Sequence, residues 1–130
     1  MKHEIKLQPQ YYNFMLNGTK RVELRLFDEK RQQIKIGDTI KILKEPDLIE
    51  SFEVKVIGLL RYKSFEYMFN DFDISILADK TMSKEQLIND LEKFYTKEKQ
   101  KKYGVLGIRV ELTKNLILNN EVLLKLNFFT

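Results

Sequence analysis

Hydrophobic and polar residues alternate along several short stretches of the chain, as they do in β-strands that bury one face. The clearest stretch separates three apolar residues by single charged ones: Val22, Leu24 and Leu26. Because successive side chains of a strand point to opposite faces, we expect these three in the core. Arg21, Glu23 and Arg25 then share the opposite face, which is either a solvated surface or the wall of a polar cleft.

The same alternation recurs elsewhere in the chain. It predicts further strands at 4–7, 39–43, 52–60 and 105–112. Turn residues separate these stretches, notably Gly37, which permits a left-handed backbone, and Pro46. The chain is therefore expected to hold a sheet of about five strands.

Apolar residues at helical spacing predict two main helices and a shorter one. The first helix starts at Pro9 and stops at Gly18, and a short helix is expected at 64–70 with a serine cap. Ser83 and Gln86 form a capping box that opens the last helix. Its apolar stripe consists of Leu87, Ile88, Leu91, Phe94 and Tyr95.

Three segments lack so clear a pattern. Residues 71–80 are expected to run over the surface, and the charged residues 96–102 are expected to form a solvated helix end. The tail, 116–130, has apolar runs on both sides of an Asn-Asn turn, which predicts an added hairpin or an appendage without a core of its own. We therefore expect one domain over 1–115, followed by this tail.

The order of these elements predicts an α+β fold. A strand and a helix come first, followed by several strands that two helices interrupt. Strands joined by turns, without regular helical crossovers, favour a curled mixed sheet or small barrel over a doubly wound parallel sheet.

Charge and composition narrow the function classes. Twenty-three basic and nineteen acidic residues give a net charge of +4, which is compatible with nucleic acid or another anionic partner. The absence of cysteine excludes disulfides and thiolate metal sites, and the single histidine, His3, disfavours a zinc site. No metal or cofactor is assigned. With no signal-peptide pattern and no apolar run of membrane-spanning length, a cytoplasmic protein is expected.

Five segments, taken in order, resemble the ASCH domain family of the PUA-like superfamily. They are the helix end at 15–18, the signature at 18–25, the turn at 36–38, and the segments at 62–65 and 103–108. The resemblance runs from His3 to about Leu112. It implies a five- or six-stranded β-barrel closed by helices, in an RNA-associated module whose cleft holds the signature residues Lys20, Glu23 and Arg25.

The resemblance also implies a possible chemistry. Some small bacterial relatives remove the acetyl group of N4-acetylcytidine with a lysine, a threonine and a glutamate, and others are reported as ribonucleases. The lysine matches Lys20, but the threonine position matches Glu23, so that hydroxyl is missing here. The family's glutamate falls near 79–81, where no equivalent can be placed.

Lys20, Glu23 and Arg25 are the leading candidates for a site, and two interpretations stay open. In a cleft, the two cations would bind a phosphate or polarise a carbonyl, and Glu23 would accept from a nucleobase amine or act as a base. On a solvated face, the same residues would be an ion-pair ladder that contributes little to stability.

Further candidates carry the same pair of interpretations. Arg21, Lys30 and Arg31 are expected either to contact an RNA backbone at the rim of the cleft or to be ordinary surface charges. Tyr62 would stack a base or belong to the core, and Ser64 would bind the ligand or cap a helix. A lysine-rich segment is either a phosphate contact or a solvated helix end: Lys97, Lys99, Lys101 and Lys102.

Three hypotheses follow. The first is an RNA- or nucleotide-binding module. The second is a small hydrolase of a modified nucleoside or of RNA, in which Lys20 and Glu23 are catalytic and Arg25 stabilises developing negative charge. The third is self-association or partner binding through the apolar tail 116–130.

Overall fold

The computed structural model of the chain describes residues 1–117, with side chains up to residue 113. Its centre is one five-stranded sheet in the order β1-β3-β4-β5-β2. The strands are β1 (Lys2–Leu7), β2 (Val22–Leu26), β3 (Thr39–Lys44), β4 (Ser51–Tyr62) and β5 (Val105–Ile117). β1 pairs with β3 in parallel, and all other neighbours are antiparallel.

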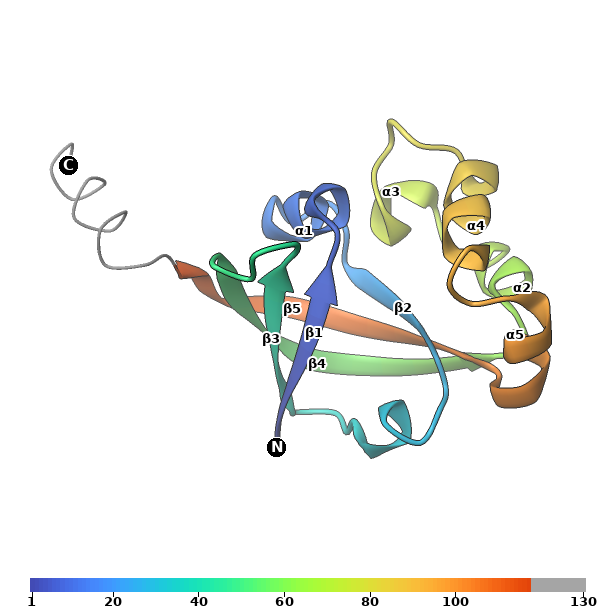
Figure 1. Ribbon diagram of the computed structural model, residues 1–130, viewed down its shortest axis with the longest axis horizontal. Helices are drawn as coiled ribbons and strands as arrows, with labels where there is room; N and C mark the ends of the chain where they lie inside the picture. The colour runs from blue at the N-terminus through green and yellow to red at the C-terminus, as the bar shows by residue number, and fades with distance from the viewer. Residues whose placement is uncertain (118–130) are drawn as a thin grey trace, which may run out of the picture.

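Short helices surround the sheet (Figure 1). They are α1 (Pro9–Leu16), the 3-10 turn η1 (Arg31–Gln33), α2 (Phe65–Phe69), α3 (Ile74–Leu77), α4 (Lys84–Glu92) and α5 (Lys97–Tyr103). α1 covers one part of the sheet, and α2 to α5 gather beside β2 (Figure 1). None of the helices in residues 1–117 has the length and apolar character of a membrane span.

The sheet is curled into a half-barrel, as the pattern of strands and turns predicts. The long pair β4 and β5 contains register shifts, including one between Val56 and Gly58, and such bulges bend and twist a sheet. The curl brings the two edge strands together: Arg25 of β2 donates through Nη2 to the carbonyl oxygen of Lys6 of β1, at 2.9 Å. β1 and β2 are the two edges of the sheet and do not pair with each other. This side-chain contact bridges the seam between them.

Two hydrophobic clusters hold the helices to the sheet. One lies between α1 and the strands, where Tyr12 packs on Phe52 with ring centroids 4.9 Å apart. The other lies between β2 and the later helices, and includes Val22, Met68 and Leu87. The predicted inward residues of β2 are all buried, which confirms the strand pattern.

Several expectations need correction. The segment 71–80 contains α3 and buries Leu77 completely, because this helix covers β2. The segment 96–102 lies mostly within a separate helix, α5, whose Gln100 is buried. Phe94 of the expected apolar stripe is 56% exposed. Of the predicted tail, the first two residues continue β5, and 118–130 lie outside the described residues.

Candidate functional site

The signature residues lie on β2 and on the turn that precedes it. Gly18, with a φ of +83°, ends α1, and the backbone N–H groups of Thr19 and Lys20 both donate to the carbonyl oxygen of Phe14. This tight turn directs Lys20 back beneath the start of β2. Although Glu23 points away from the apolar residues of its strand, it is only 4% exposed. It lies opposite Ile108 of β5, on the inner face of the curled sheet, where Lys20 and Arg25 flank its carboxylate.

Lys20 is an internal ammonium group whose hydrogen bonds are all made within the protein. It is 3% exposed and donates to the carbonyl oxygens of Val22 at 2.6 Å and Leu77 at 2.8 Å. Its third neighbour is Oε1 of Glu23 at 3.4 Å. An ammonium has three N–H donors, and these three neighbours account for all of them. The contact with Leu77 also ties α3 to β2.

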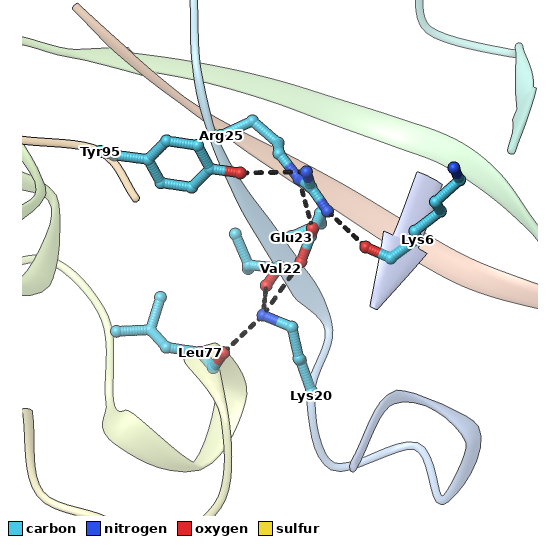
Figure 2. A network of polar contacts seen from close by, with 7 residues as sticks. All are labelled: Lys6, Lys20, Val22, Glu23, Arg25, Leu77 and Tyr95. Carbon is cyan, nitrogen blue, oxygen red and sulfur yellow. Dashed lines mark hydrogen bonds and ion pairs between the residues drawn. The ribbon is translucent and has the colours of Figure 1, made fainter. Parts of the chain in front are cut away.

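Glu23 lies between two cations, as Figure 2 shows. Its Oε2 accepts from Nε of Arg25 at 2.7 Å, and its Oε1 faces Lys20. Burial by itself raises the pKa of Glu23, but the charges of Arg25 and Lys20 outweigh burial and hold the pKa below its usual range. The carboxylate therefore stays ionised.

Lys20, Glu23 and Arg25 form a charged triad. Arg25 is the member that reaches the seam between the edge strands β1 and β2. Besides Glu23, its guanidinium donates to the hydroxyl of Tyr95 at 3.0 Å and to the carbonyl oxygen of Lys6 (Figure 2). Burial lowers the pKa of Arg25, yet Glu23 and Tyr95 more than offset this and raise it. For Lys20 burial prevails, so its pKa is lowered despite Glu23.

A pocket of about 300 Å³ opens above this triad, between the ends of β1 and β2, α1 and α4. Its charged lining is balanced, with three cations and three carboxylates: Lys6, Lys20, Arg25, Glu23, Glu45 and Asp90. The rest of its lining is mainly aromatic and aliphatic: Leu7, Gln8, Tyr11, Leu24, Leu87, Leu91, Phe94 and Tyr95. The triad side chains that line this pocket are largely buried, so they do not form a solvated face.

One polar pair of the pocket was not found from the sequence. The hydroxyl of Tyr11 donates to Oδ2 of Asp90 at 2.7 Å, joining α1 to α4. Burial raises the pKa of Tyr11, and Asp90 raises it further, so the phenol stays protonated. The capping box and the apolar stripe predict α4 itself. They cannot predict this hydrogen bond, because Tyr11 and Asp90 are 79 residues apart and no local pattern relates them.

The remaining predicted residues lie elsewhere. Arg21 and Lys30 are exposed, and neither lines this pocket. Arg31 is half-buried; its Nε has no hydrogen-bond partner among the described residues, and the positive charge of Arg25, next to burial, lowers its pKa. Tyr62 and Ser64 line a second cavity beside α5, where Ser64 caps α2 through the N–H of Tyr67 at 3.3 Å.

No group of three or more His, Asp or Glu side chains able to hold a metal ion exists within residues 1–117. Of the three carboxylates in the pocket, Glu23 is engaged by Lys20 and Arg25, and Asp90 accepts from Tyr11. Chemically, the pocket offers preorganised charge and ring faces to a small polar ligand.

Comparison with known proteins identifies relatives of this architecture. The family model of the ASCH domain matches residues 5–114. The crystal structure of the hypothetical protein PH0355 is similar over 87% of this chain and 100% of its own, with 38% identity and a TM-score of 0.74. The solution structure of PF0455 from Pyrococcus furiosus is similar over 86% and 97%, with 35% identity and a TM-score of 0.67.

A more distant structure shares the fold. A mutant of the ASCH protein ZmASCH from Zymomonas mobilis matches with a TM-score of 0.59 at 12% identity, over 98% of this chain and 94% of that one. No curated protein matches the chain.

Proposed function

Because this chain belongs to the ASCH domain family, a PUA-like family associated with RNA binding, we propose that its pocket binds one nucleotide of an RNA. The observation that carries this proposal is the ionised triad of Lys20, Glu23 and Arg25 at the base of an aromatic-walled pocket. Ligand pockets of proteins typically combine apolar walls with a few convergent polar groups in this way.

Arg25 and Glu23 are the groups that would read the ligand. Arginine has five N–H donors, and three of them reach Glu23, Tyr95 and Lys6, so two have no partner among the described residues. They suit a phosphate oxygen or the carbonyl edge of a base. The second oxygen of Glu23 faces Lys20 at 3.4 Å, and an ionised carboxylate can accept from the exocyclic amine of a base.

Aromatic rings supply the second part of base recognition. Tyr11, Phe94 and Tyr95 line the pocket, and Phe94 remains 56% exposed at its mouth. A ring face stacks on any base, which is worth about 1–3 kcal/mol per base. An exposed phenylalanine at a pocket mouth therefore supports stacking better than a role in the core.

Hydrolysis is the second hypothesis, and one observation favours it: burial lowers the pKa of Lys20, which brings a neutral lysine base closer to physiological pH. Its three internal acceptors oppose this role, because Val22, Leu77 and Glu23 stabilise the protonated ammonium, which has no lone pair to take a proton from a substrate. We therefore expect no release of cytidine when the protein is incubated with N4-acetylcytidine, followed by chromatography.

The binding proposal is tested by calorimetric titration with the four nucleoside monophosphates and by anisotropy with short labelled RNAs. Phe94→Ala should weaken binding about 5- to 150-fold, which is the stacking energy expressed as a ratio. The matched control is Tyr67→Ala, which removes another exposed ring, 61% exposed on α2 and outside the pocket, and should leave affinity unchanged. Equal affinities of both variants and the parent would overturn the proposal.

A further inference from the structure

The second cavity is a groove beside α5, and its charge differs from that of the pocket. It has a volume of about 760 Å³ and lies between the end of β4, the start of α2, and α5. Five of its lining residues are cations: Arg61, Lys63, Lys97, Lys101 and Lys102. Only two are carboxylates, Glu66 and Glu92, so this α5 groove carries an excess of positive charge.

The cations of the α5 groove are not neutralised internally. None of its four lysines forms an ion pair within the described part of the chain. Lys102 lies over the ring of Tyr103 at 5.0 Å, and Arg61 lies over the ring of Phe27 at 3.9 Å. An aromatic ring carries no net charge, so these contacts do not neutralise Lys102 or Arg61, and both remain able to bind an external anion.

Buried hydrogen bonds fix the shape of the groove. Gln100 is 3% exposed; its Oε1 accepts from the N–H of Phe65 at 3.1 Å, and its Nε2 donates to the carbonyl oxygen of Tyr95 at 2.8 Å. One side chain of α5 is thereby fastened to the first residue of α2 and to the segment after α4. Three of the four lysines, Lys97, Lys101 and Lys102, therefore project from a helix that is hydrogen-bonded to α2 and to Tyr95.

Two tyrosines add ring faces to the groove. Tyr62 and Tyr103 both line it and are half-buried. The hydroxyl of Tyr62 donates to Asp71 at 2.7 Å, which orients its ring. Interleaved cations and aromatic rings are typical of surfaces that bind single-stranded nucleic acid.

One residue connects the pocket to the groove. Tyr95 lines the pocket and accepts from Arg25 through its hydroxyl, while its backbone carbonyl accepts from Gln100, which lines the groove. Tyr95 thereby connects the wall of the pocket to the wall of the α5 groove.

We propose that the α5 groove binds the sugar–phosphate backbone of single-stranded RNA, a role that extends the proposed function of the pocket. Phosphates displace counterions from the lysines, which makes affinity fall as salt rises. A single strand fits better than a duplex, since the neighbouring pocket takes an unstacked base. The expected division is that the pocket recognises one nucleotide, and the groove supplies affinity for the strand that continues from it.

The test compares two triple variants that remove the same charge. The groove variant is Lys97→Gln, Lys101→Gln and Lys102→Gln, and the control is Lys35→Gln, Lys55→Gln and Lys80→Gln. All six lysines are exposed, and the control lysines line neither cavity. Both proteins are titrated with a labelled ten-nucleotide single-stranded RNA at several salt concentrations, and with a nucleoside monophosphate.

The groove variant should reduce the slope of log K against log salt by about 2, because each lost phosphate contact on a single strand accounts for about 0.7. Its RNA affinity should fall more than about tenfold at low salt, and its mononucleotide affinity should stay within about twofold. A variant with three arginines at the same positions should restore the slope. Circular dichroism verifies that all variants fold.

The outcomes separate this inference from the proposed function. If both triple variants weaken RNA equally, the groove has no special role, and the inference is overturned whatever the pocket binds. If mononucleotides fail to bind but RNA binding depends on the groove lysines, the inference about the groove is supported and the proposal about the pocket is overturned. An acidic peptide or an anionic vesicle bound as tightly as the RNA would also overturn the choice of partner.

Discussion

The pocket and the α5 groove use the same kinds of side chain in opposite ways. In the pocket, three cations and three carboxylates balance, and the central ones are buried and hydrogen-bonded to each other or to backbone carbonyls. In the groove, five cations face two carboxylates, and its lysines stay without ion pairs within residues 1–117. The buried charges of the pocket fix its shape and leave a ligand only two N–H donors of Arg25 and one oxygen of Glu23, whereas the exposed lysines of the groove are fully available to a partner.

This difference sets what salt and mutation should do in each region. Buried charges are poorly screened by salt, and exposed ones are strongly screened. Removing one member of a buried pair leaves the other uncompensated, which costs far more than the pair itself contributes. The pocket should therefore be sensitive in stability, and the groove in RNA affinity.

The largest effect is expected at Lys20. Lys20→Met removes the ammonium from beside Glu23 and leaves two backbone carbonyls without their donor, which should lower the free energy of unfolding by about 3–5 kcal/mol. Lys101→Met in the groove should change it by less than about 0.5 kcal/mol. Urea denaturation measures the free energy of unfolding of both variants. Similar losses in the two would contradict the difference between buried pocket charges and exposed groove charges.

The next effect is on acid stability and involves Glu23. Its pKa in the folded protein is held below the value of 4.5 expected for the unfolded chain, so between these two values only the unfolded chain takes up the proton. The free energy of unfolding should then fall as the pH drops below about 4.5, by at most about 1.4 kcal/mol per pH unit for this group.

Glu23→Gln should lose this part of the pH dependence while being less stable at neutral pH. Denaturation at a series of pH values, for parent and variant, gives the difference directly. Parallel curves for the two proteins would mean that Glu23 is not held ionised by its neighbours.

A smaller effect is expected at the residue that joins the two regions. Tyr95→Phe removes the acceptor of Arg25 but keeps the ring and the carbonyl that Gln100 uses, and should cost about 1–2 kcal/mol of stability. Mononucleotide affinity should fall, because the guanidinium loses one of its three anchors. The salt slope for RNA should be unchanged, and a reduced slope would contradict the division between pocket and groove.

The smallest effect separates two roles of Ser64. Its hydroxyl caps α2 by accepting from the N–H of Tyr67, so Ser64→Ala should lower stability by about 0.5–1 kcal/mol and leave RNA affinity as it was. Ser64→Asp, which keeps a capping oxygen, should recover the stability. Loss of RNA affinity in the alanine variant, without loss of stability, would indicate that the serine contacts the ligand instead.

Local patterns in the sequence predict the elements well and the site only in part. Alternation places Glu23 opposite the buried face of β2, and the Ser83 capping box starts α4 at the right residue. Alternation cannot say whether the charged face is enclosed, which here follows from the curl of the sheet that places Glu23 opposite Ile108 of β5. It also cannot predict that Lys20 donates to the Leu77 carbonyl of α3, 57 positions away.

Contacts between β1 and β2 and between α1 and α4 also cannot be predicted from local sequence patterns. The bond from Arg25 to the Lys6 carbonyl depends on how far the sheet curls, and the pairing of Tyr11 with Asp90 depends on how α1 and α4 meet. The lysines after Thr96 have the composition of a solvated helix end. Only the packing of Gln100 against α2 turns them into one wall of a groove.

The most direct test of the account is a map of backbone-amide chemical shifts in the isotope-labelled protein during two titrations. A nucleoside monophosphate should shift amides around Tyr11, Glu23 and Leu91 and leave α5 unchanged, and a short single-stranded RNA should shift both sets. If neither ligand moves the amides of the pocket, the claim that the buried triad serves nucleotide binding is wrong.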